Sequence, residues 1–262
     1  MKQSHQSIVV TVAIALTCIA GLGALQFPRL QSARNRNSQL STAELQRQDQ
    51  LTQARLDLME RTPTFGFGNL TAKWTFLNFL QYFGDEPARL ETGYDLSPEY
   101  FEVILSQDPY FWDAYLFLSG STTLYAGQPE RAIALMDEHL PQLSPKVPDR
   151  AYYIWRWKGV DELLFLGDSQ AAQASFETAA DWASAYTDSE SEAIAAQSRQ
   201  TAEFLADDPN SRPAQISAWT SVFYTAVSDD VRQLAISRMQ ALGAQVSLSA
   251  DGQLQVQLPP DE

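Results

Sequence analysis

The side chains that most often carry catalysis are few in this chain. Its two histidines are His5 and His139, and its single cysteine, Cys18, lies in an apolar run. A Ser or Cys nucleophile needs a base within hydrogen-bond reach, and nothing in the sequence places such a partner beside His139. We therefore predict no catalytic residues and a protein that is not an enzyme.

Metal and nucleotide sites are not predicted either. The acidic run 188–192 (DSESE) lacks the glycine and the spaced ligands of a calcium loop. Gly66 and Gly68 lack the third glycine and the preceding strand of a dinucleotide-binding loop. We expect no cofactor and no metal. Paired carboxylates are expected at helix starts or on solvent-facing surfaces: Asp161-Glu162 and Asp229-Asp230.

The charge of the chain is strongly acidic and unevenly distributed. Lys and Arg total 18 against 32 Asp and Glu. Residues 1–60 carry six basic and four acidic side chains, so the remainder holds twelve and twenty-eight. A body this acidic is repelled by phosphate backbones and by anionic lipid head groups, which argues against a nucleic-acid partner.

One pattern of small and apolar residues occurs twice between residues 108 and 180. Two helices cross closely where the side chains are small, and a glycine supplies the turn between them. The pattern therefore predicts helical hairpins in an all-α solenoid. The first copy consists of Gly120, Gly127, Ala132 and Met136, and the second of Gly159, Gly167, Ala172 and Phe176.

Helices are expected on both sides of these two copies. Ser41 and Glu44 have the spacing of a capping box at the start of the first one. The helix at 69–83 is apolar on most of its surface, so we expect neighbouring elements to cover it. Alternating apolar residues from Val246 to Leu258 predict a two-stranded hairpin that caps the last helices. The predicted helices span 41–60, 69–83, 98–107, 110–126, 129–140, 149–166, 168–184, 193–206, 213–227 and 229–242.

The doubled pattern resembles the tetratricopeptide repeat (TPR) family. That repeat carries Gly, Gly or Asn, Ala and Phe at the positions that correspond to Gly120, Gly127, Ala132 and Met136. The second copy matches through Gly159, Ala172, Phe176 and Ala179 once one extra residue is allowed. The likeness departs at His139 and Thr123, where the family prefers a small residue and a tyrosine, so we expect a loosened second helix there.

The order of the segments resembles a group of bacterial membrane-anchored tetratricopeptide-like proteins, common in cyanobacteria and mostly without an assigned activity. The shared features are an N-terminal apolar segment, the block at 66–85 and a repeat that begins with Asp108-Pro109. The resemblance implies a tethered adaptor or assembly factor.

An uncharged apolar run extends from Ile8 to Leu25, about the length that crosses a bilayer as a helix. We predict an uncleaved single-pass membrane anchor in preference to a cleaved signal peptide, whose small exit residues are poorly supplied here. Positive charges flank the run on both sides and leave open which side of the membrane the body occupies. The predicted domains are an N-terminal flank (1–7), a transmembrane anchor (8–27), a tether and juxtamembrane helix (28–61), a TPR-like repeat domain (62–243) and a β-hairpin cap and tail (244–262).

Two binding hypotheses follow. In the first, a protein partner lies in a groove formed by the first helix of each pair, where Arg156 pairs with a carboxylate of the partner or, alternatively, with an acidic residue of this chain. In the second, the aromatic block at 65–83, together with 110–112, lines a cavity for a lipid or pigment. The predicted partner-binding residues are Phe117, Ser121, Tyr125, Tyr153, Arg156, Val160 and Leu164.

Overall fold

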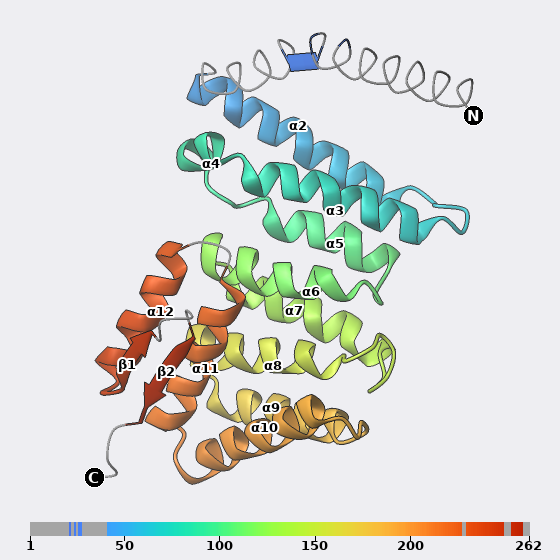
Figure 1. The fold of residues 1–262 in the computed structure, drawn as a ribbon. Helices are drawn as coiled ribbons and strands as arrows, with labels where there is room; N and C mark the ends of the chain where they lie inside the picture. Colours follow the sequence, from blue (N-terminus) through green and yellow to red (C-terminus); the bar gives the residue numbers. More distant parts are fainter. Residues whose placement is uncertain are drawn as a thin grey trace, which may run out of the picture.

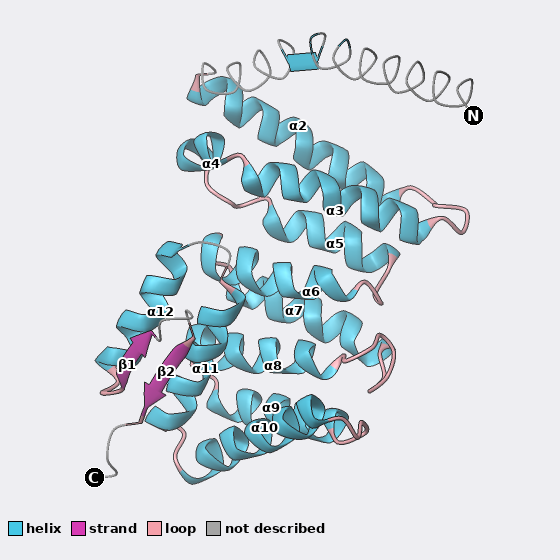
Figure 2. Ribbon diagram, in the orientation of Figure 1, coloured by secondary structure: helices cyan, strands magenta, loops and turns pink. Residues whose placement is uncertain are grey.

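The computed structural model describes residues 41–226, 229–248 and 253–258, together with Gly21, Ala24, Gln26 and Phe27 (Figure 1). Within these residues the protein is mostly helical, with eleven α-helices and one small antiparallel sheet. Helices α2 to α10 follow one another from one end of the molecule to the other, and α11, α12 and the sheet lie along one side (Figure 2). The predicted helical character and the predicted C-terminal hairpin are confirmed.

The N-terminal helices pack around α5. The hydroxyl of Ser41 accepts a hydrogen bond from the Glu44 amide, and the Glu44 carboxylate accepts one from the Ser41 amide, so the predicted capping box is confirmed. Both α2 and α3 contact α5, and α4 is a helix that the sequence pattern did not predict. The bounds are α2 (Thr42–Arg61), α3 (Gly68–Gly84), α4 (Glu86–Thr92) and α5 (Ser97–Gln107).

The two central hairpins differ from the prediction in the same way. Each first helix ends in a π-helical segment, in which the turns are wider than in an α-helix. Gly127 and Gly167 follow with φ of 65° and 68°, conformations that a side chain disfavours. The segments are α6 (Trp112–Leu118) with the π-helix Ser119–Tyr125, α7 (Pro129–His139), α8 (Tyr152–Asp161) with the π-helix Glu162–Leu166, and α9 (Ser169–Ala183).

The small residues of the doubled pattern lie mainly at helix contacts. A Cβ on Gly159 would lie 3.1 Å from the ring of Phe176, so α8 and α9 approach closely at this position. Ala132 and Ala172 are fully buried. Gly120 is the exception, because a Cβ there would meet no described atom within 4 Å.

The C-terminal part consists of α10 (Ser189–Asp207), α11 (Arg212–Thr225), α12 (Asp229–Ala241), β1 (Gln245–Leu248) and β2 (Leu254–Gln257). Helix α10 begins earlier than predicted because Asp188 caps it by accepting a hydrogen bond from the Ser191 amide. The acidic run therefore forms the cap and first turn of a helix, where carboxylates are favourable. Val246 pairs with Val256, and both pack against the α11–α12 pair, as expected of a cap.

The expected loosening of α7 near His139 is not found. His139 is buried at the end of the helix, and its ring Nδ1 lies 3.4 Å from the side-chain nitrogen Nε2 of Gln142. Burial lowers the pKa of His139. Thr123, the other departure from the repeat pattern, donates a hydrogen bond to Asp161.

The predicted membrane localisation needs correction. Among the described residues, no helix is long and apolar enough to cross a bilayer. The helices of sufficient length, α2 and α10, carry charged side chains along their sequences. The predicted anchor at 8–27 lies outside the described residues except for four of its positions, so a single-pass anchor is not supported.

Candidate functional site

Part of the predicted groove forms a cavity of about 70 Å³. Its walls come from α6 and α8 with their π-helical segments, from the end of α3 and from the α11–α12 pair. Four of the predicted groove residues line this cavity together: Phe117, Ser121, Tyr125 and Val160. Leu164 lines a second cavity, of about 370 Å³, between the π-helix of α8 and α11–α12.

Arg156 points away from this cavity and towards α10. Its guanidinium donates to Ser198 Oγ at 2.6 Å and to Gln197 Oε1 at 3.0 Å, both on α10, and the residue is 7% exposed. Burial lowers its pKa to about 10. Tyr153 donates to Glu190 at the start of α10. Both side chains therefore join α8 to α10 and do not line the cavity, and the partners found for Arg156 are neutral side chains.

We expect Arg156→Ala to destabilise the fold. The substitution removes two hydrogen bonds and leaves Ser198 buried without its partner. We expect the free energy of unfolding to fall by about 2 kcal/mol. Urea unfolding of the variant measures this loss, and Arg199→Ala on the exposed side of α10 is the control. An unchanged midpoint for Arg156→Ala would contradict the structural role.

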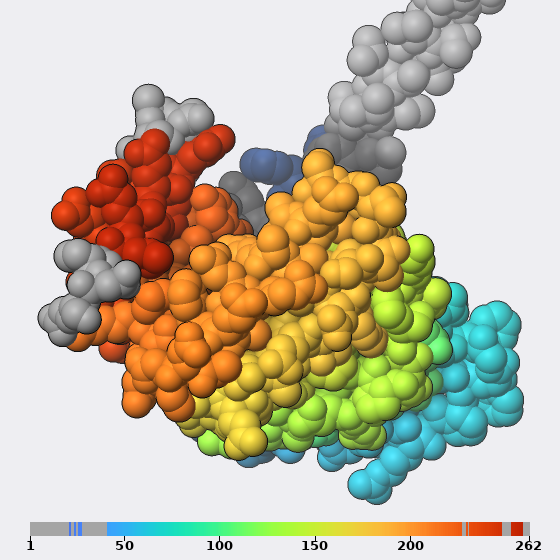
Figure 3. Space-filling view, turned by 90° about the horizontal axis from the view of Figure 1, so that it is seen from below, coloured from blue at the N-terminus to red at the C-terminus, as the bar shows by residue number. Residues whose placement is uncertain are grey.

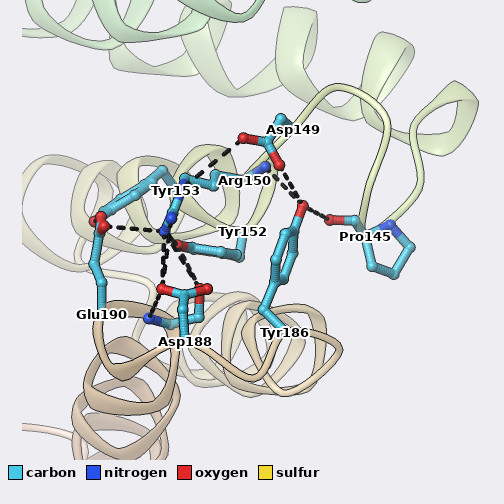
Figure 4. Close-up of polar contacts among 9 residues, drawn as sticks. Pro145, Asp149, Arg150, Tyr152, Tyr153, Tyr186, Asp188 and Glu190 are labelled. Carbon is cyan, nitrogen blue, oxygen red and sulfur yellow. Dashed lines mark hydrogen bonds and ion pairs between the residues drawn. The ribbon is translucent and has the colours of Figure 1, made fainter.

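Another positive residue of the same region, Arg150, is held by internal contacts (Figure 4). It forms ion pairs with Asp188 at 3.4 Å and Glu190 at 3.1 Å, and donates to the Tyr152 hydroxyl at 2.8 Å. The Tyr186 hydroxyl, drawn beside Asp149 and Pro145, accepts from the Arg150 amide. The cluster ties the connector before α8 to the start of α10, so the concentration of positive and aromatic residues near 150–158 serves packing within the chain.

Asp161 is buried at the cavity wall, contrary to the expected solvent-facing position. It is 2% exposed, and Oδ2 accepts from Thr123 Oγ1 at 3.1 Å. Burial raises the pKa of Asp161 to about 7, against the opposing effect of hydrogen bonds from Ser119 and Thr123. The sequence carries no signal for this burial, because the covering helices α11 and α12 come 50 residues or more later.

The outer side of α3 carries a row of exposed apolar side chains. Four large side chains are more than half exposed: Phe67 (65%), Leu70 (64%), Trp74 (62%) and Leu77 (53%). Lys73 lies among them and is also exposed. We call Phe67, Leu70, Lys73, Trp74 and Leu77 the α3 outer face. Figure 3 shows the cyan segment that contains the α2–α3 connection projecting at the edge of the molecule.

The opposite side of α3 is core. Ala72 and Phe79 are fully buried, and Phe79 packs against Phe101 at 4.7 Å between ring centroids. The expectation that neighbours cover the whole helix is therefore wrong for the described residues. The spacing of Leu70, Trp74 and Leu77 was visible in the sequence, but a helix that is apolar on both sides does not reveal which side faces inward.

Comparisons with models of protein families, with curated proteins and with solved structures returned no match.

Proposed function

We propose that this protein is a helical-repeat adaptor that binds another protein through the α3 outer face. The observation that supports it is a row of large apolar side chains, including a tryptophan, exposed on successive turns of one helix. Clustered exposed apolar residues mark interaction surfaces, and aromatic residues dominate the binding energy of such surfaces. The adaptor needs no catalytic groups, in keeping with the predicted non-enzymatic role.

The finer architecture is part of the proposal. We infer that α6 to α9 are tetratricopeptide-like hairpins within a solenoid. The positive φ of Gly127 and Gly167 and the close approach of Gly159 to Phe176 support it, because these are the turn and crossing positions of the doubled pattern.

Charge indicates the chemistry of the partner. Helix α3 has no carboxylate, and Lys73 is its single charged residue. A partner with an apolar surface and a carboxylate opposite Lys73 complements this face. A second copy of the chain fits less well, because a two-fold contact on α3 brings Lys73 towards its own symmetry mate and joins two chains of net charge −14.

The test begins with a partner recovered by the full chain, identified and then purified. Replacing Trp74 and Leu77 together by serine is expected to weaken its binding at least 100-fold, since central anchors contribute about 2 kcal/mol or more each. Lys73→Glu is expected to weaken it as well. Titration calorimetry measures each dissociation constant, with Tyr224→Ser, which changes a 63% exposed side chain on α11, as the matched control.

Three results would contradict the proposal. The partner could bind the Trp74/Leu77 variant as tightly as the wild type. The wild type could form a dimer in sedimentation equilibrium that the same substitutions dissociate, so that a second copy occupies the face. Finally, binding could require removal of residues 1–40, so that the chain's own N-terminal segment covers α3.

A further inference from the structure

The cavity beside α8 combines an aromatic wall with one buried carboxyl group. Asp161 supplies the carboxyl group of the cavity wall. Ser121, 1% exposed, also lines the cavity, and its hydroxyl has no hydrogen-bond partner among the described residues. Five aromatic side chains complete much of the wall: Phe83, Phe117, Tyr125, Trp157 and Phe165.

No described cation forms an ion pair with Asp161. Lys158, the lysine of the same helix, instead contacts Glu162 and lies 3.2 Å from Asp137 Oδ1. A buried carboxylate without a counter-ion is costly, and so is a buried hydroxyl without a partner. A ligand that brings a positive charge and several donors would relieve both costs.

We propose that this cavity binds the end of a primary alkylammonium group, with Asp161 as its counter-ion. An ammonium group offers three donors, which suit the carboxylate and the Ser121 hydroxyl. Aromatic faces attract cations and also pack against the adjoining methylene groups. The acidic surface of the chain raises the local concentration of cations.

The volume limits the ligand. A water molecule needs roughly 10–15 Å³ of cavity measured with a water-sized probe, so a cavity of about 70 Å³ holds a chain of about five non-hydrogen atoms. This size suits the end of an aliphatic amine. Two sources share this chemistry: the side chain of a lysine in a peptide and a free alkylamine.

The test compares n-butylammonium with n-butanol, a neutral probe of similar shape, by titration calorimetry on the full chain at pH 8. We expect the ammonium to bind at least tenfold more tightly than the alcohol. Asp161→Asn is expected to weaken butylammonium at least tenfold and to change butanol binding less than twofold. Asp181→Asn, at an exposed position of α9, is the matched control.

Gly120→Leu provides a second variant that leaves Asp161 in place. Gly120 lines the cavity, and a side chain there meets no described atom within 4 Å at its Cβ, so leucine is expected to fill the space and weaken both probes. Equal binding of the two probes by the wild type, or undiminished butylammonium binding by both variants, would overturn the proposal.

A capped lysine and a capped norleucine distinguish the two sources. Tighter binding of lysine than of butylammonium assigns the cavity to a peptide side chain, and weaker binding assigns it to a free amine. The α3 outer face takes no part in either measurement, so the two proposals fail independently.

Discussion

Asp161→Asn is expected to raise the free energy of unfolding at pH 8 by up to roughly 4 kcal/mol and to leave it nearly unchanged at pH 4. Burial raises the pKa of Asp161 from 3.8 to about 7. Below pH 3.8 both the folded and the unfolded chain carry a protonated Asp161, so the residue contributes no pH dependence there.

Between pH 3.8 and about 7 the unfolded chain has released the proton and the folded chain has kept it. The free energy of unfolding therefore falls as the pH rises, by about 1.4 kcal/mol for each pH unit, and levels off above pH 7. Asparagine keeps the shape of the side chain and cannot ionise, which removes this decline. The neighbouring charged group is Glu162, which also favours the protonated form of Asp161.

Urea unfolding of the wild type and the variant across this pH range measures the effect. The remaining carboxyl groups titrate in both proteins, so the difference between the two curves isolates Asp161. A difference that stays constant from pH 4 to pH 8 would show that Asp161 ionises as it does in water.

Phe79→Ala is the second large effect, with an expected loss of about 3–5 kcal/mol in the free energy of unfolding. Phe79 is fully buried at the centre of the N-terminal core, with ring centroids 4.7 Å from Phe101 and 5.5 Å from Phe83. Alanine leaves a cavity between α3 and α5 that these rings cannot fill. Ordinary proteins have a free energy of unfolding of about 5–15 kcal/mol, so this loss is a large part of the total.

Leu77→Ala on the same helix is the control for Phe79→Ala. Leu77 is 53% exposed, so its substitution is expected to change the free energy of unfolding by less than about 0.5 kcal/mol. Thermal and urea unfolding compare the two variants directly. Similar losses for both would mean that the outer side of α3 is packed in solution, contrary to its exposure in this structure.

Local rules predicted the elements that depend on local interactions. The Ser41–Glu44 box and the Gly127 and Gly167 turns involve residues within a few positions of one another, so the sequence pattern is sufficient. The pairing of Val246 with Val256 likewise follows from alternation on both sides of a short turn.

The candidate site depends on contacts between distant segments and was only partly predictable. Phe117, Tyr125 and Val160 line the cavity because the first helices of two hairpins lie side by side, as the doubled pattern predicts. Arg156 points to α10, where it bonds to Ser198 and Gln197. The repeat pattern does not specify the position of α10, so the sequence could not show that Arg156 binds within the chain and not to a partner. The π-helical segments and the outward side of α3 also left no distinguishable signal.

We propose above all that the α3 outer face contacts another protein. The most direct measurement places a photo-activated benzophenone amino acid at position 74 of the full chain in its native cells, with the same group at position 224 as the control. We expect a covalent product at position 74 with a partner that has an apolar, acidic surface, and no such product at position 224. No product at position 74, or a product with a second copy of this chain, would contradict this proposal.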